Sequence, residues 1–404
     1  MKKRFLDIRN TTLIVGITLL ILFYIGYFIY GFQIEINGGV DYLAHYSAGY
    51  IMRYEKPSEV YNQLVQKSVQ VKIFKSDGSS QFYPYNHPPL LLGILRLLTD
   101  TNYLMSYIRW LLMLLVFHLL GLIIQFRLMT FVGWTPSPDL WIFCVSSFLF
   151  YPAFLAYIRG QDSTFFLLGI SLWSFGILTS QDKYAGLGLT LALIRPQIIF
   201  VLVIPFLFKR QKVLMWFILF SILLFIYCYF LVGYQGLIGF VEILFVSGQG
   251  YGFDVDKMIT FMGAIQRAFP TIEPQMLHFI GYGGYFLAII PLCILWVKSK
   301  FIELKHIGLA LLVSMLVTPH MHNHDFVILL IPTMGATVSL IKFRGMSQKF
   351  APLLPLCVSL VLLLKDITNI FLLTYLLFIL LAVLLWFPAR FMINARKFNN
   401  IDIA

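Results

Sequence analysis

Long apolar runs constrain this chain more than any other feature. A hydrophobic stretch from Thr11 to Phe32 is followed by a mixed segment over 33–87, and apolar runs then recur to the C-terminus. Windows of roughly 20 apolar residues are long enough to cross a bilayer as a helix. Only 12% of the residues are charged, whereas soluble domains carry about 25%. The sequence therefore predicts a polytopic membrane protein, folded as a single integral-membrane domain over 1–404.

The membrane-spanning segments are expected to be helices. Backbone groups in lipid must be satisfied within the segment, and no ten-residue alternating pattern suggests a barrel. The fold class is thus all-α, with about twelve spanning helices. In the second half of the chain they are expected near 213–232, 276–297, 307–318, 325–341, 352–364 and 369–388.

Basic residues set the expected orientation. The formal net charge is +12, but the charges cluster in short connectors between apolar runs, which indicates the positive-inside pattern rather than a nucleic-acid surface. Both termini are therefore expected in the cytoplasm, and the first helix, which lacks a cleavage site, is expected to be retained. The five groups are Lys2 to Arg4 with Arg9, Lys209 to Lys212, Lys298 to Lys305, Lys342 to Lys349, and Arg390 to Lys397.

Two threadings of residues 88–208 agree with these charges. In one, 88–99 crosses the membrane and 184–208 is a single helix. In the other, 88–99 only dips into the membrane and 184–208 forms a helical pair hinged at Arg195-Pro196. We favour the second, because it places Arg127 and Lys183 inside, as the charge rule prefers.

Two external segments are expected, at 33–87 and 233–275. In the first, Tyr42, Tyr46, Tyr50 and Tyr54 recur every four residues, which predicts an amphipathic helix lying in the headgroup layer as a lid over the site. A second interfacial helix is expected near 58–74.

The external segments and connectors carry four groups of polar residues. The first is Asp41 with His45; alone, Asp41 is more typical of a helix N-cap than of a catalytic base. The second is Arg159-Gly160-Gln161-Asp162, a short connector between two apolar runs. The third is Arg195-Pro196-Gln197, where the arginine is either a phosphate ligand or a snorkelling side chain.

The fourth group is rich in histidine: His320, His322 and His324 alternate just before Asp325. Alternating histidines bind zinc only when an extended backbone makes them converge. They can equally hold a phosphate or orient sugar hydroxyls, and this second interpretation is the one we favour. The four cysteines are isolated and form no metal or redox motif.

In order and spacing, these segments resemble glycosyltransferase family 87, the polyprenyl-phosphate-mannose-dependent α-mannosyltransferase-like group of the GT-C superfamily. The resemblance covers about 38–335, and the family's usual lysine is replaced by Arg195. The matching segments are Asp41-Tyr42 with Tyr46-Ser47-Ala48 and Val60-Tyr61-Asn62; Tyr85-Asn86-His87-Pro88-Pro89-Leu90; Gly160-Gln161-Asp162-Ser163-Thr164; Ala185-Gly186-Leu187-Gly188 through Arg195-Pro196-Gln197; and Thr318-Pro319-His320 with His322 and Asp325.

The resemblance implies a GT-C-type fold and an inverting, metal-independent hexosyltransferase that needs no cofactor. The donor would be a polyprenyl-phosphate sugar, with mannose expected, and the acceptor a glycan or glycolipid on the extracytoplasmic face of the cell membrane. Asp41 would be the general base. Donor ligands would be Arg195, His322, Arg159, Gln161, His320 and Asp325, with His45, His87, Gln197, Asp162 and His324 as further candidates.

Two other functions stay open. A polysaccharide polymerase or ligase using a lipid-linked oligosaccharide would share external arginines and histidines, although its critical polar loop tends to come late in the chain. A secondary transporter is disfavoured, since it would place ionisable groups near the middle of the membrane.

Overall fold

The structure, a computed structural model, describes residues 2–36, 41–74, 82–134, 137–247, 255–341 and 349–386, and every regular element within them is helical. Among these residues, seven helical segments are long and apolar enough to cross a membrane. Five further apolar helices are shorter, at 10–17 residues. The prediction of an all-α membrane protein is confirmed, whereas the count of about twelve spanning helices and the GT-C-type fold stay predictions.

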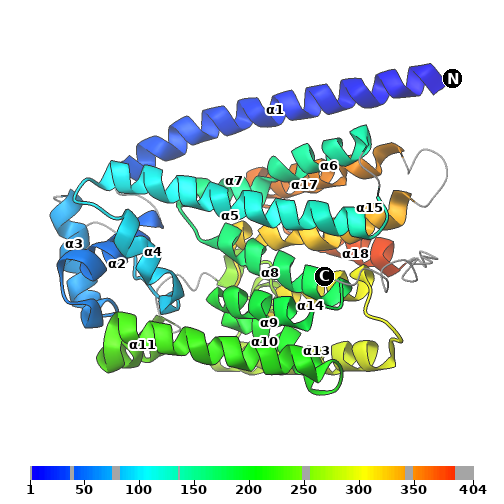
Figure 1. The fold of residues 1–404 in the computed structure, drawn as a ribbon. Coiled ribbons are helices and arrows are strands. Elements are labelled where there is room, and N and C mark those ends of the chain that lie inside the picture. Colours follow the sequence, from blue (N-terminus) through cyan, green and yellow to red (C-terminus); the bar gives the residue numbers. More distant parts are fainter. Residues whose placement is uncertain are drawn as a thin grey trace, which may run out of the picture.

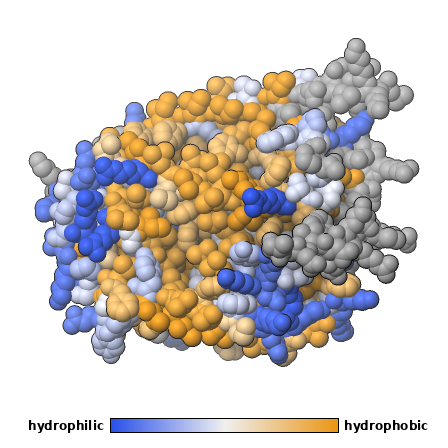
Figure 2. Space-filling model, viewed as in Figure 1, coloured by the Kyte–Doolittle hydropathy of each residue, from blue (hydrophilic) through white to orange (hydrophobic). Residues whose placement is uncertain are grey.

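The long helices run side by side, and a cap of short helices closes one end of the bundle (Figure 1). The cap consists of α2 (Tyr42–Tyr54), α3 (Gln63–Phe74), and α4 (Leu92–Leu98), with the 3-10 turns Pro57–Glu59 and Pro89–Leu91. On the face in Figure 2, hydrophobic side chains cover the middle of the bundle while hydrophilic ones gather toward its two ends. This is the distribution expected of a protein whose middle is surrounded by lipid.

Helix α1 (Lys2–Ile36) lies on the outside of the bundle and runs toward the cap (Figure 1). It packs mainly on α7 (Tyr151–Arg159), where the Tyr24 ring stacks on Phe154 with ring centroids 3.9 Å apart. Most of its apolar side chains, such as Leu19 and Leu22, stay exposed on the protein surface. Burial in lipid rather than in protein accounts for such a helix.

Helix α2 differs from the helix predicted at the same residues. Ten of its thirteen residues are buried, and Tyr42 and Tyr46 are 1% and 0% exposed inside the protein. The tyrosine spacing does form a helix, but its first half belongs to the core rather than to a lid on the headgroup layer. The four-residue spacing was misleading because it describes a buried aromatic stripe equally well.

Two glutamines of α3 fix the extended segment that follows it. The Gln66 side chain accepts a hydrogen bond from the Tyr85 backbone N–H (2.8 Å), and Gln70 accepts one from the Tyr83 N–H (3.1 Å). Glutamines one helical turn apart thus pair with alternate residues of an extended chain. These two hydrogen bonds position the segment so that His87, which follows it, lies in the interior of the cap.

The next three helices of the chain run between the two ends of the bundle. Helix α5 (Tyr103–Phe131) leads away from the cap, and α6 (Pro138–Phe148) with α7 returns to it. Gly160 ends α7 in the left-handed conformation, at φ 61°. A side chain there would be strained and would meet Tyr42, since an added Cβ lies 2.6 Å from the Tyr42 Cβ.

The segment 184–208 is a hinged pair, as the favoured threading predicts. Helix α8 (Ser163–Leu178) is followed by α9 (Asp182–Leu191), the turn Ala192–Ile194, α10 (Pro196–Val203), and the turn Ile204–Leu207. Arg210 at the far end of this segment pairs with Asp182 at its start. A single helix over 184–208 would be roughly 37 Å long at 1.5 Å per residue, so its ends could not meet.

The expected external segment 233–275 is partly helical. Helix α11 (Gln211–Ser247) continues through it with a kink at Gly233, whose φ is 68°. Its second half packs beside the turn Pro57–Glu59 of the cap. The turn Val255–Lys257 and α12 (Phe261–Ala268) follow, before α13 (Pro274–Lys298).

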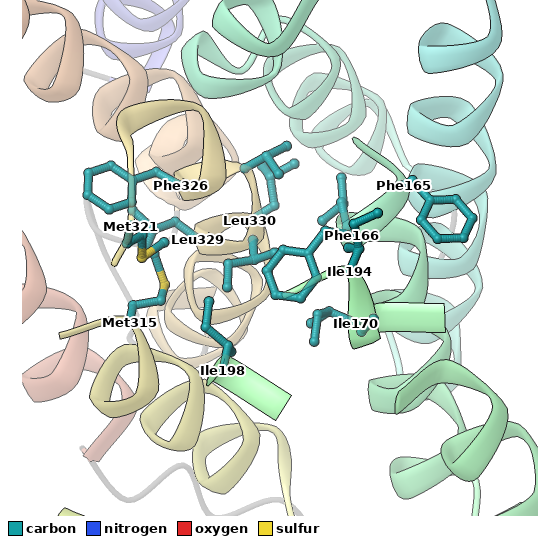
Figure 3. Packing of buried hydrophobic residues seen from close by; sticks show 14 of the residues in the cluster. Phe165, Phe166, Ile170, Ile194, Ile198, Met315, Met321, Phe326, Leu329 and Leu330 are labelled. Carbon is teal, nitrogen blue, oxygen red and sulfur yellow. The ribbon is translucent and has the colours of Figure 1, made fainter. Parts of the chain in front are cut away.

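The last part of the chain forms the core next to the hinged pair. Its elements are α14 (Leu304–Val317), the turn Asn323–Leu329, α15 (Leu330–Ile341), the turn Ala351–Leu353, α17 (Leu354–Thr368) and α18 (Leu372–Trp386). Figure 3 shows Phe326 and Leu330 facing Phe166, Ile194 and Ile198 across this core. These buried residues directly neighbour the polar groups described below.

We expect Gly188→Ala to destabilise the protein by about 1–3 kcal/mol, because overpacking of a close contact has that cost. An added Cβ on Gly188 would lie 2.2 Å from the Trp173 backbone nitrogen, where α9 packs on α8. Thermal unfolding in detergent measures the effect. Gly283→Ala is the matched control, since nothing lies within 4 Å of its Cβ position; equal unfolding temperatures in both variants would contradict the prediction.

Candidate functional site

A buried arginine and two aspartates form the centre of the candidate site. Arg195 Nη2 lies 2.9 Å from Asp162 Oδ1 and 2.9 Å from Asp325 Oδ1. Arg195 Nε donates a further hydrogen bond to Asp325 Oδ1 at 2.9 Å. The three residues are 7%, 0% and 3% exposed. Residues far apart in the sequence are thus joined in one ion-paired cluster beneath the cap.

Each member of this cluster lies at a break between helices. Asp162 precedes the first residue of α8, Arg195 is followed by Pro196 at the start of α10, and Asp325 belongs to the turn before α15. Helix ends leave backbone groups unpaired and allow short-range reversals of the chain. The apolar helices on either side anchor the breaks, so the charged groups meet with little freedom of movement.

Electrostatics keep this cluster charged despite its burial. Burial alone opposes ionisation of Asp162, but the nearby Arg195 and His87 outweigh it and hold the pKa of Asp162 well below its ordinary range. Burial likewise disfavours the charged form of Arg195, yet Asp162 and Asp325 raise its pKa above the ordinary value. An ion pair that loses water must be compensated by such direct partners.

Two histidines of the cap complete the cluster. His87 Nδ1 lies 2.9 Å from Asp162 Oδ2 and 3.2 Å from Arg195 Nη1. His45, on α2, points its Nε2 to within 3.6 Å of the same Asp162 oxygen and is fully buried. Burial lowers the pKa of His87, although Asp162 partly opposes that effect.

The histidine-rich segment lies against Arg195 and is held from two sides. The Gln197 amide donates to the His320 carbonyl (3.3 Å), and the His322 backbone N–H donates to Asp325 Oδ2 (3.4 Å). On the other side, the Asn323 side chain donates to Asp366 Oδ1 at 2.7 Å. The contact with Asp325 lies within the segment itself, whereas Gln197 and Asp366 come from α10 and α17 and fix it from two sides.

The residues Lys365 and Asp366 were missed by sequence reasoning. Lys365 is 4% exposed, and its Nζ donates to Asp366 Oδ1 (2.9 Å) and to Asn323 Oδ1 (3.2 Å). Tyr151 donates to the other Asp366 oxygen. The available signal was a lysine and an aspartate at the end of an apolar run, where a charged pair is costly without partners.

Asp41 and Arg159 lie close to the histidine-rich segment. Burial lowers the pKa of His322; the charge of Asp41 raises it and the charge of Arg159 lowers it. Asp41 precedes the first residue of α2 but makes no side-chain capping hydrogen bond, so the capping interpretation does not explain it. Arg159 is the last residue of α7, and its side chain makes no hydrogen bond or ion pair within the described part of the chain.

Both arginines were expected to bind the donor, but their surroundings in the structure differ. Arg195 neither snorkels nor offers a free guanidinium, because each of its nitrogens already has a partner. Arg159 keeps its donors available. Gln161 is 8% exposed in the connector just beyond it, and its backbone N–H donates to the Ala156 carbonyl.

The alternating histidines do not form a metal-ligand group among the described residues. The His320 and His322 rings meet edge to face at 4.6 Å, while the His324 Nε2 points toward Asp325 at 3.8 Å. The group with ligand spacing is instead His45, His87 and Asp162, whose ligand atoms lie within 4.8 Å of one another. These residues come from three separate segments, so no sequence spacing could reveal the group.

The chain is thus an integral membrane protein with a buried charged cluster at the capped end of its helical bundle. No family model matches it, and no curated protein or solved structure matches it significantly. The resemblance to glycosyltransferase family 87 stays a prediction from short segments.

Replacement of Arg195 by methionine should destabilise the protein by about 3–5 kcal/mol, because it leaves buried carboxylates without their countercharge. The double variant Arg195→Met/Asp325→Asn should regain part of that loss, since one unpaired charge is then removed. Thermal unfolding of the purified proteins in detergent is the measurement. A double variant less stable than Arg195→Met would contradict this account.

Acidification should destabilise the folded state through His320. Burial, with the neighbouring His322 as a second cause, lowers its pKa to about 3, against about 6.5 in an unfolded chain. Between these values the unfolded state binds a proton that the folded state does not, so stability falls as the pH drops below about 6.5. Unfolding temperatures measured from about pH 8 to 5 should fall less steeply in His320→Gln; identical slopes would contradict the prediction.

Proposed function

We propose that this protein is a membrane glycosyltransferase that moves a hexose from a polyprenyl-phosphate carrier to an acceptor hydroxyl on the extracytoplasmic face. One observation carries the proposal: an apolar groove is walled by helices that lead to Asp41 and to Arg159, whose side chain has no partner among the described residues. An apolar groove whose helices continue toward an acid and a guanidinium suits a lipid with a sugar phosphate at its head.

The groove lies between α1 and the pair α6 and α7. Its volume is about 380 Å³, and the residues that line it are almost all apolar: Ile21, Tyr24, Ile25, Phe28, Ile29, Phe148, Leu149, Phe154 and Tyr157. Tyr24 stacks on Phe154, and further along both helices Gly31 packs on Ile158. The residue numbers rise together, so the two walls run in the same direction.

Both walls end in a polar group. Helix α1 leads to Asp41 at the start of α2, and α7 ends at Arg159, two residues beyond Tyr157 of the groove. An isoprenoid chain in the groove would place its phosphate near the Arg159 guanidinium, whose planar fork suits phosphate oxygens. The anomeric carbon would then lie between that phosphate and Asp41.

The reaction we propose is a single displacement. The acceptor oxygen forms a bond to the anomeric carbon from the side opposite the phosphate, while the bond from that carbon to the phosphate oxygen breaks. Asp41 takes the hydroxyl proton as the attack develops. The electron pair leaves with the lipid phosphate, and Arg159 together with an N–H of neutral His322 stabilises that charge. The configuration at the anomeric carbon is inverted.

The buried cluster has a positioning role in this proposal. Asp162 and Asp325 neutralise Arg195, so the arginine holds the connector after Arg159 and the segment that bears His322. In this proposal, the residues that act on the acceptor and on the leaving phosphate depend on segments that these ion pairs hold in place. Arg195 then acts on catalysis through geometry and not through direct contact with the donor phosphate.

The substitution Asp41→Asn should lower sugar transfer by roughly 10²–10⁴-fold, the usual loss when a general base is removed. Transfer is measured in membranes with a panel of labelled polyprenyl-phosphate sugars, mannose among them, and with a lipid-linked oligosaccharide. Asp100→Asn, an exposed acid at the same end, is the control and should keep full activity. An unchanged rate in Asp41→Asn removes the proposed base, and consumption of the oligosaccharide alone favours a polymerase or ligase.

Arg159→Gln should weaken binding of the donor far more than binding of the acceptor. The guanidinium contributes a charge-assisted contact to the phosphate, for which a loss of about tenfold or more is expected. The apparent KM for the donor and for the acceptor are compared with those of Arg109→Gln, an arginine already paired with Asp100. Equal losses for both substrates would point to a general structural defect and against a phosphate contact.

A further inference from the structure

His45 is a buried imidazole without a hydrogen-bond partner. Its side chain is fully buried, and neither ring nitrogen makes a hydrogen bond. Aromatic rings of Tyr85, His87 and Trp110 surround it, with centroids 4.8 to 5.6 Å away. A buried polar group left unpaired destabilises the folded state, so this environment calls for a ligand that the described residues do not supply.

Two other donors face the same point. His45 Nε2 lies 3.6 Å from Asp162 Oδ2, and the same oxygen lies 2.9 Å from His87 Nδ1. The three ligand atoms all fall within 4.8 Å of one another. Ligands about 2.0–2.1 Å from a tetrahedral zinc ion stand roughly 3.3 Å apart, so the two distances to Asp162 Oδ2 are near that value and the histidine nitrogens would move closer together on binding.

The surroundings suit a bound cation as well. Arg195 contacts Oδ1 of Asp162 at 2.9 Å, which leaves Oδ2 directed at the histidines. A ligating carboxylate is commonly held by a further partner on its other oxygen, and here the ion pair with Arg195 supplies that support. Metal binding would replace the longer contact of Arg195 Nη1 with His87, at 3.2 Å, and keep the contacts with both aspartates.

Charge balance allows a divalent ion. Asp162 and Asp325 carry two negative charges and Arg195 one positive charge, so these three groups leave one net negative charge. Two imidazole nitrogens and one carboxylate oxygen are the donors that first-row transition metals, zinc among them, prefer over calcium or magnesium. The ligand types of this site therefore favour a transition-metal ion, which acidic residues alone would not do.

We propose that His45, His87 and Asp162 bind a divalent transition-metal ion, Zn²⁺ in the first instance. The ion would join three segments: α2, the extended segment before α4, and the connector between α7 and α8. Asp41 lies one helical turn before His45, and Arg159 lies three residues before Asp162. A metal at this point would fix the distance between these two residues. The transfer step proposed above needs no metal, so the inference goes beyond it.

The test is the metal content of the purified protein. Protein from zinc-supplemented cultures, purified without chelators, should contain about one Zn²⁺ per chain by elemental analysis. His45→Gln and His87→Gln should each lose nearly all of it, while His320→Gln, at the same end but outside the group, should keep it. Size-exclusion profiles establish that each variant is folded.

A second measurement is made on the wild-type protein, so that its main result does not depend on whether the variants fold. The chelator-stripped protein should unfold at a higher temperature after addition of Zn²⁺, because a ligand bound only to the folded state stabilises it. Co²⁺ should give visible absorption bands that His45→Gln does not give. Stripped, folded wild type that takes up neither ion overturns the proposal, as does about one Zn²⁺ per chain retained in both histidine variants.

The outcome is independent of the proposed reaction. Asp41→Asn should contain the same amount of zinc as the wild type even when it transfers no sugar. Zinc binding without transfer from any lipid-phosphate donor would leave the metal site standing and reject the glycosyltransferase. Transfer by a wild-type protein that takes up neither Zn²⁺ nor Co²⁺ would keep the glycosyltransferase and reject the metal site.

Discussion

The contact of Arg195 with Asp162 and Asp325 is the interaction on which the rest of this structure depends. It joins the connector after α7, the hinge before α10 and the turn before α15. An arginine that is 7% exposed is tolerable in such surroundings only because two carboxylates compensate for its lost hydration. The same requirement fixes the geometry, since an ion pair without water has few arrangements in which every donor finds an acceptor. The cap, the histidine-rich segment and the unpaired Arg159 all take their positions from this cluster.

The helical architecture could be predicted from the sequence, because it depends on local properties of continuous stretches of the chain. Apolar length predicts helices, and the expected segments 276–297 and 352–364 correspond closely to α13 and to α17 with its preceding turn. The hinge at Arg195-Pro196 was also predictable, because proline opens a helix readily but interrupts one when placed inside it. The kinked helix α11 was not predicted. Gly233 was interpreted as the end of a helix, whereas in the structure the helix changes direction there and continues.

The site could be predicted only in part, for a different physical reason. Polar residues at helix ends were identifiable one by one, but which of them pair depends on the three-dimensional path of the chain. Arg195 was expected to face a phosphate, because an unpaired arginine in an apolar run calls for an anion. The anions it has found are Asp162 and Asp325, themselves expected to orient the sugar. Lys365 and Asp366 escaped notice because they are adjacent in the sequence, whereas their shared partner Asn323 comes from another helix.

A division of labour between two arginines follows from these contacts. A guanidinium that serves as a structural bridge cannot also bind a mobile substrate, because release of either carboxylate would leave a buried charge unpaired. A guanidinium at the edge of an apolar groove has the opposite properties: it is free to bind an anion, and water can replace that anion when it leaves. The chain keeps the bridging arginine deep in the protein and Arg159 at the end of α7, beside the groove residue Tyr157. In the reaction proposed above, Arg195 would give rigid support and Arg159 would bind the lipid phosphate reversibly, so that separate residues would serve the two roles.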